Sequence, residues 1–307
     1  MNLRSFSKLL AAAALLCAAA TPRAQKLQLA ITVDDLPAHS ELPPGTTRQQ
    51  VAQTFLDTFH REHMPPIYGF VNGIRTEQAP ATMQVLQAWH NAGEPLGNHT
   101  WAHTDLNDQT AEQFLADVDR NQMLLNQIDP HGQKQKWLRY PFLHEGDTVE
   151  KRRAVRAGLF ARGYRIAEVS MDFEDYLWNE PYARCSAKND PEALRYLHDS
   201  YLETADRYIT VSRGLSQQAF HRDIPYVLLM HIGAFDAKML PELIALYRQR
   251  GFTFTTMPKA LRDKAYKLDP DNGDIDGGSF TELLLEARQE TVAPDTKPYE
   301  TLDKLCR

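Results

Sequence analysis

The sequence predicts an α/β fold built on a largely parallel β-sheet. Short apolar, β-branched runs alternate with amphipathic stretches of helical length, which is the pattern of repeated strand-helix units. Seven such units favour either a closed barrel or a doubly wound open sheet, and both architectures place their active sites at the carboxyl ends of the strands. The predicted strands cover residues 27–33, 66–71, 95–99, 137–142, 164–171, 225–232 and 252–257.

The predicted helices have recognisable first and last residues. Thr46 or Thr47 can cap a helix that buries Phe55 on its apolar face. Thr110 and Gln113 have the spacing of a capping box before the next amphipathic run. Further helices are expected after Pro80, before Gly163, before Gly251, over 191–220 as the longest one, and over 280–287.

The N-terminus has the features of an export signal. Arg4 and Lys8 precede an apolar run over residues 9–20, and small residues suited to cleavage follow it. The run is too short to span a bilayer, so we expect an exported protein, periplasmic or secreted, with no transmembrane segment after signal removal. The expected units are a signal peptide over 1–24, a catalytic domain over 25–264 and a C-terminal extension over 265–307.

The charge of the chain limits its partners. Cleavage fits equally well after Ala20 or after Ala24. Cleavage after Ala24 removes Arg4, Lys8 and Arg23 and takes the formal net charge from −6 to −9. A strongly acidic body argues against nucleic acid or an anionic membrane surface as partner, and it favours a neutral or cationic substrate.

Cys185 and Cys306 are the only cysteines outside the predicted signal. An oxidising compartment permits a disulfide bond between them, which would tie the C-terminal tail to the body. Closing so long a loop contributes roughly 4 to 5 kcal/mol in a chain-entropy treatment. Two unpaired cysteines agree with the sequence equally well.

Polar side chains follow several predicted strands. Asp34 and Asp35 end the first strand, where two adjacent carboxylates need a partner, water or a function. His99 ends the third strand, and a helical turn beginning there would bring His103 to the same side. With Asp35, these two imidazoles make up the ligand set of a catalytic zinc site. Arg139 ends the fourth strand, where a guanidinium can keep a carboxylate ionised, although a surface arginine fits equally well.

The fifth and sixth predicted strands also end in polar residues. The fifth runs into DFEDYLW, which supplies Asp172, Asp175, Tyr176 and Trp178. Acids beside aromatic rings suit a sugar-binding wall, while the same rings also fit ordinary packing at the rim. The sixth strand ends in LLMH at His231, and a lone histidine after an apolar strand is more often structural than catalytic.

Together these five motifs resemble the polysaccharide deacetylases of the NodB-homology type, carbohydrate esterase family 4. They read TVDD, HTWAH, RYPF, DFEDY and LLMH, in the family's order and across residues 27–260. The resemblance implies a distorted (β/α)7 barrel, which agrees with the number of predicted strands. Val33 replaces the usual phenylalanine of the first motif, and Tyr176 replaces the usual tryptophan of the fourth.

The resemblance also implies roles for the residues at the first three strand ends. Asp35, His99 and His103 would hold a divalent metal, most often zinc. Asp34 would be the general base, with Arg139 as its ionic partner.

For the C-terminal motifs the resemblance implies an acid and a pocket. His231 would be the general acid, and Asp175 would keep it protonated. Leu229 would line the pocket for the acetyl methyl group, with Leu228 and Met230 as alternatives.

The reaction implied is removal of N-acetyl groups from N-acetylhexosamine-containing glycans, either envelope polysaccharide or chitin-like oligomers, with release of acetate. The backbone N–H of Tyr140 would stabilise the oxyanion, and Tyr176 and Trp178 would contact the glycan. One alternative is hydrolysis of another amide or a cyclic imide by the same metal chemistry. A second is a catalytically silent glycan-binding barrel, against which the presence of both Asp34 and His231 argues.

Overall fold

The computed structural model describes residues 26–132, 135–273, 277–292 and 296–307, and the predicted signal peptide lies outside this part of the chain. A strand occurs at each of the seven predicted positions, although four of them have only three residues. The strands are β1 (Leu27–Leu36), β2 (Tyr68–Val71), β3 (Leu96–Asn98), β4 (Lys136–Leu138), β5 (Tyr164–Ile166), β6 (Tyr226–His231) and β7 (Phe252–Phe254).

Helices fill the connections between the strands. None of those in the described residues is long and apolar enough to cross a membrane. The α-helices are α1 (Arg48–Arg61), α2 (Ile74–Gln78), α3 (Met83–Asn91), α4 (Ala111–Ile128), α5 (Val149–Ala161), α6 (Asn179–Lys188), α7 (Pro191–Phe220), α8 (Ala234–Gln249), α9 (Met257–Ala260), α10 (Phe280–Ala287) and α11 (Tyr299–Lys304). Short 3-10 turns are η1 (Pro80–Thr82), η2 (Pro141–Leu143), η3 (Asp175–Trp178) and η4 (Lys264–Lys267).

All strand pairs are parallel, which confirms the predicted fold class. The strands follow the order β5-β4-β3-β2-β1-β6, and β7 pairs with the beginning of β1. The sheet is not closed by a continuous ladder. However, the chain after β5 turns back to β6, where Met171 pairs with Leu228 and accepts a hydrogen bond from the Leu229 N–H at 3.1 Å. The sheet therefore curls into a distorted barrel with one short bridge across its opening.

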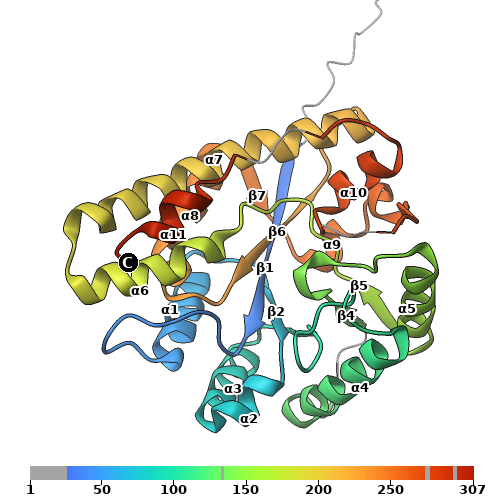
Figure 1. Ribbon diagram of the computed structural model, residues 1–307, viewed down its shortest axis with the longest axis horizontal. Coiled ribbons are helices and arrows are strands. Elements are labelled where there is room, and N and C mark those ends of the chain that lie inside the picture. Colours follow the sequence, from blue (N-terminus) through green and yellow to red (C-terminus); the bar gives the residue numbers. More distant parts are fainter. Residues whose placement is uncertain (1–25, 133–134, 274–276, 293–295) are drawn as a thin grey trace, which may run out of the picture.

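The helices form a layer around these strands (Figure 1). Two predicted caps are present as full capping boxes, Thr47 with Gln50 before α1 and Thr110 with Gln113 before α4. Such reciprocal bonds satisfy backbone N–H groups that a helix start leaves without partners. The predicted longest helix is α7, capped by Asp190.

Alternation along β1 and β6 separates an outer from an inner face. Leu228 and Met230 belong to the main core between the sheet and the helices, as do the outward residues of β1. Val227 packs instead in the small cluster inside the curled sheet. Because side chains alternate along a strand, Leu229 and His231 share the inner face with Val227.

The C-terminal region packs against the body. The Phe280 N–H donates to the carbonyl of Val169 at 2.7 Å, and α10 lies on α7 (Figure 1). Cys185 of α6 and Cys306 form a disulfide bond with a Cα–Cα distance of 5.2 Å. The open question about these two cysteines is thus answered in favour of pairing.

Candidate active site

Asp34 and Arg139 form a buried ion pair at the centre of the inner face. Nη1 of Arg139 donates to both carboxylate oxygens of Asp34, at 3.1 and 3.0 Å. The guanidinium also donates to the carbonyl of Ala167 at 2.7 Å and to Thr32 Oγ1 at 3.1 Å. Each residue is only 1% exposed. A carboxylate held this way keeps a fixed orientation, as general-base chemistry requires.

Asp35 turns toward the same site because the backbone leaves the strand geometry there. Its φ is 65°, in the left-handed region, so alternation along β1 stops after Asp34. Thr100 and His103 also have positive φ values, 61° and 55°. Non-glycine residues adopt this conformation at a cost and are concentrated at functional sites.

The predicted helical turn at His99 is wrong. Residues 99–103 form an irregular loop, and the two left-handed residues bend it so that the imidazoles of His99 and His103 meet with centroids 4.8 Å apart. The rings are therefore neighbours through loop geometry rather than through a shared helical face.

One oxygen of Asp35 and both imidazoles converge on a common point. Nε2 of His99 lies 3.6 Å from Asp35 Oδ1, and Nε2 of His103 lies 3.3 Å from it. These three ligand atoms all lie within 4.8 Å of one another. Oδ1 is buried and has no hydrogen-bond partner among the described residues. An orphaned carboxylate oxygen facing two imidazole nitrogens fits a divalent cation.

A second bond fixes the tautomer of His99. Its Nδ1 lies 2.8 Å from the backbone carbonyl of Arg139, which can only accept, so Nδ1 carries the proton. In the neutral ring the lone pair is then on Nε2, the nitrogen that faces Asp35 Oδ1. Backbone carbonyls orient metal-binding histidines in this way in many proteins.

The electrostatics agree with a ligand set. Burial by itself would raise the pKa of Asp35, but the hydrogen bond from His39 and the charges of His103, His39 and His231 lower this pKa well below its usual value. Burial lowers the pKa of His103 to about 4, against the opposing charge of Asp35. At neutral pH this corresponds to one carboxylate and a neutral imidazole, both able to bind a cation.

His231 and Asp175 form the opposite wall. Nδ1 of His231 donates to Asp175 Oδ1 at 2.8 Å, and its backbone N–H donates to Oδ2 at 2.7 Å. Burial would lower the pKa of His231, but the charge and hydrogen bond of Asp175 outweigh it and raise this pKa to about 10. The imidazole is therefore a proton donor at neutral pH.

The N-terminal part of the chain matches a known protein family. The polysaccharide deacetylase family model matches residues 22–159. The chain is therefore similar to this family over these residues. The matched segment contains Asp34, Asp35, His99, His103 and Arg139, whereas Asp175 and His231 lie beyond it.

Solved structures share the fold over a longer part of the chain. The chitin deacetylase of the fungal pathogen Colletotrichum lindemuthianum is 21% identical with a TM-score of 0.54, covering 83% of this chain and 94% of that one. A carbohydrate esterase family 4 pseudoenzyme from Bacillus anthracis is 12% identical with a TM-score of 0.52, covering 78% and 66%. A family 4 carbohydrate esterase from Streptomyces lividans in complex with acetate is 14% identical with a TM-score of 0.50, covering 78% and 97%. No curated protein matches the sequence.

The structure distinguishes the three candidates for the methyl pocket. Leu229 lies on the same strand face as His231, whereas Leu228 and Met230 point into the outer core. Of the three, only Leu229 is positioned to line a pocket beside the site. Its contact with an acetyl group stays a prediction.

The predicted contact of Trp178 with the glycan is wrong. Its ring is fully buried, packs against Phe173 and Tyr201, and donates from Nε1 to Ser200 Oγ at 2.9 Å. The turn η3 directs this side chain into the core, so it cannot contact a glycan. Tyr176 takes the opposite direction and is 37% exposed, with its ring 5.1 Å from that of His231.

Tyr140 does not offer its side chain to the site either. The ring stacks on Phe114 at 5.5 Å in the outer layer and is 2% exposed. Only its backbone N–H, the group predicted to bind the oxyanion, can take part, and that role stays a prediction.

Sequence reasoning missed an aromatic residue at the rim. Phe142 is 55% exposed, has a φ of 59°, and its ring lies 4.7 Å from that of His103. Phe142 and Tyr176 therefore stand beside the two ends of the site. The RYPF motif contains this residue, but nothing in the motif predicts the positive φ that turns it outward.

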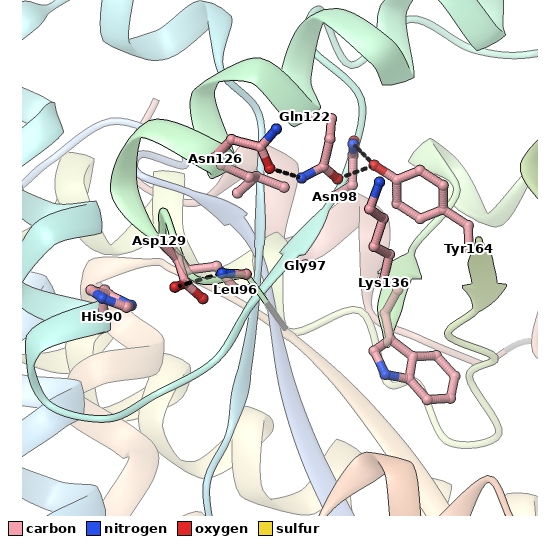
Figure 2. A pocket seen from close by; sticks show the side chains of 12 residues that line it. His90, Leu96, Gly97, Asn98, Gln122, Asn126, Asp129, Lys136 and Tyr164 are labelled. Carbon is pink, nitrogen blue, oxygen red and sulfur yellow. Dashed lines mark hydrogen bonds between the residues drawn. The ribbon is translucent and has the colours of Figure 1, made fainter. Parts of the chain in front are cut away.

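Asn98 was also missed, and it supports the histidine loop. Its Oδ1 accepts from the Thr100 N–H and from Asn121 Nδ2, both at 2.9 Å, and its Nδ2 donates to the Tyr164 hydroxyl at 2.7 Å. Figure 2 shows Asn98 and Tyr164 in the wall of a pocket beside α4. None of the predicted site residues lines this pocket, so we assign the chemistry to the curled inner face instead.

Proposed function

We propose that the protein is a metal-dependent hydrolase that removes N-acetyl groups from N-acetylhexosamine-containing glycans and releases acetate. The observation that carries this proposal is the arrangement of three groups on one inner face. A carboxylate held by Arg139 lies beside the Asp35, His99 and His103 ligand set, with the Nε2 of His99 3.7 Å from Asp34 Oδ2. The protonated His231 lies on the other side.

In the proposed reaction, Asp34 accepts a proton from the water that attacks the acetamide carbonyl carbon. The two bonds from Arg139 fix the orientation of the Asp34 carboxylate. His231 donates a proton to the amine nitrogen as the carbon-nitrogen bond breaks. The products are acetate and a free amino sugar.

Asp35, His99 and His103 would hold the divalent cation, for which zinc is the first choice because its usual ligands are imidazole nitrogen and carboxylate oxygen. When bound, such a cation polarises the carbonyl and makes water more acidic. Two of the three ligands are oriented by a further hydrogen bond, His99 through the Arg139 carbonyl and Asp35 through His39.

A glycan is the preferred substrate class for two reasons. Phe142 and Tyr176 offer exposed ring faces on either side of the site, and aromatic rings are common platforms for sugars. In addition, one of the proteins with this fold is a chitin deacetylase. An acidic protein surface also suits a product that becomes cationic, and it disfavours nucleic acid as partner.

Two alternatives use the same geometry. The metal chemistry can open a different amide or a cyclic imide, and the rim residues would then contact another ligand. A silent glycan-binding barrel is the second, and a pseudoenzyme is known among proteins of this fold. Against it, this chain has the base and the acid, each with its partner.

We also propose that the protein is exported and works in the periplasm or outside the cell. The N-terminal sequence has the features of a cleaved signal, and the Cys185–Cys306 disulfide bond belongs in an oxidising compartment.

The test is acetate release from chitooligosaccharides by the purified chain without residues 1–24, before chelation, after chelation and after zinc is returned. Asp34→Asn is the matched control, because it removes the base and leaves all three ligands. Release that chelation abolishes and zinc restores supports the proposal. Binding of one zinc per chain without release from any glycan moves the assignment to another amide, and absence of metal binding refutes it.

A further inference from the structure

A fourth histidine, outside all five motifs, lies in the site. His39 follows Asp35 by four residues, and its Nδ1 lies 2.8 Å from Asp35 Oδ2. Its ring is 4.9 Å from that of His231 and 6.1 Å from that of Tyr176. It therefore contacts both the ligand set and the acid.

We propose that His39 is a positioning residue of the metal site: its Nδ1–H fixes the Asp35 carboxylate so that Oδ1 faces His99 and His103. This inference rests on the proposed function, since it assumes that those three residues bind a metal.

The direction of the bond follows from the chemistry of the two groups. An ionised carboxylate can only accept, so the proton lies on Nδ1 of His39. Oδ2 of Asp35 is thereby occupied, while Oδ1 has no partner among the described residues and faces both ligand imidazoles. Without His39, the carboxylate could rotate and present either oxygen, or turn toward His231. A bond that selects one orientation lowers the cost of assembling the site when the cation binds.

The backbone around His39 is itself held in place. The Ala38 N–H donates to the carbonyl of Asp35 at 2.9 Å, closing a turn between the two side chains. Arg48 in the first turn of α1 donates to the carbonyls of both His39 and Ser40. The imidazole is thus attached to a rigid element rather than to a free loop, as a group that positions another residue must be.

The ring does not act as a fourth ligand in this arrangement. Its Nδ1 is used by Asp35, and its Nε2 is buried without a hydrogen-bond partner among the described residues. The group of ligand atoms within 4.8 Å of one another comprises Asp35, His99 and His103 alone in the described part of the chain.

Three substitutions separate the bond from the bulk of the ring. In His39→Asn the amide nitrogen can take the place of Nδ1, whereas in His39→Gln it extends to the place of Nε2. His39→Phe keeps a ring and removes both nitrogens. The measurement is the zinc dissociation constant of each purified variant, determined by competition with a chromophoric chelator, together with its thermal midpoint.

We expect His39→Gln and His39→Phe to bind zinc about 10- to 100-fold more weakly than the wild type, and His39→Asn to stay within a few-fold of it. Equal affinity in all four proteins overturns the inference, and so does equal weakening in all three variants, because ring packing would then be the cause. If His39→Phe does not fold, the pair of amide variants still decides the question.

Zinc affinity is measured without substrate, so it separates this inference from the proposed function. A wild type that binds zinc and releases no acetate contradicts only the function. A wild type that binds zinc no better than His39→Gln contradicts only the role of His39.

Discussion

The carboxylate of Asp175 accepts two hydrogen bonds from His231. One oxygen accepts from the ring Nδ1 at 2.8 Å and the other from the backbone N–H at 2.7 Å. Asp175 is fully buried, so this pair is screened little by water or salt. The ring is therefore fixed in direction as well as in charge, and its other nitrogen, Nε2, carries the proton that the proposed reaction uses.

Asp175→Asn should lower the pKa of His231. Burial favours the neutral ring, and the Asp175 carboxylate outweighs burial and raises this pKa from 6.5 to about 10. The pKa should therefore fall once this charge is gone, with the charges of Asp35 and Asp34 still favouring the cation. Ring-nitrogen NMR of the metal-free protein measures this pKa in both forms. An unchanged pKa in the variant would mean that Asp175 does not control the protonation of the acid.

The same pair makes stability depend on pH in a defined direction. Because folding raises the pKa of His231, its contribution is complete below about pH 6.5 and declines as the pH rises toward 10. The difference in unfolding free energy between wild type and Asp175→Asn, measured by urea titration, should shrink over that range. A difference that grows with pH would contradict the assignment.

Asp34→Asn should bind zinc normally and lose activity by about 10²- to 10⁴-fold, because the amide cannot accept the proton. Asn can still accept one bond from Arg139, so we expect a loss of only about 1 to 3 kcal/mol in stability. Acetate release and metal content of the same preparation provide the two measurements. Substantial turnover by the zinc-loaded variant would exclude Asp34 as the base.

Most of the residues that share the site could be predicted from the sequence. Apolar alternation places the ends of β1, β3, β4 and β6, and parallel strands bring their carboxyl ends to one edge. For that reason Asp34, His99, Arg139 and His231 could be grouped from pattern alone. The pattern could not predict which of them form a pair. Asp34 and Arg139 are 105 residues apart, and only the family resemblance linked them.

What the sequence could not provide is backbone direction inside the loops. The left-handed φ values of Asp35, Thr100 and His103 occur at residues other than glycine, so no composition signal marks them. The same limit explains why the prediction for Trp178 is wrong, because the direction of its side chain depends on how η3 turns. His39 had one usable signal, its spacing of four from Asp35, but that spacing is informative only in a helix, and this segment is a loop.

His103→Ala should abolish stoichiometric zinc binding with little effect on folding. The His103 side chain is 24% exposed, so its loss leaves no large cavity, whereas His99 is 3% exposed and bonds the Arg139 carbonyl. We therefore expect His99→Ala to lose zinc and also about 1 to 3 kcal/mol of stability. Metal analysis and thermal melts of both variants test this. Wild-type zinc content in His103→Ala would remove that residue from the ligand set.

The disulfide bond should stabilise the fold and, through the tail, help to position the Asp175–His231 pair. Cys185 and Cys306 are 121 residues apart in sequence, so cross-linking restricts the unfolded chain strongly, and its loss should cost about 2 to 5 kcal/mol. The tail also contacts the residue that precedes η3, since Lys297 Nζ lies 3.0 Å from Oε1 of Glu174, next to Asp175. The variant with both cysteines changed to serine should melt on the order of 10 °C lower than the oxidised wild type.

The matched control is Lys297→Met, which removes the contact with Glu174 and keeps the disulfide bond. If the tail supports the turn η3, which carries Asp175, both changes should lower kcat for acetate release while leaving zinc affinity unaltered, because no metal ligand touches the tail among the described contacts. A double-serine variant that melts lower but retains full kcat would confine the disulfide to stability. Unchanged melting would show that Arg184, which donates to the carbonyls of Leu302 and Leu305, already holds the tail without the covalent bond.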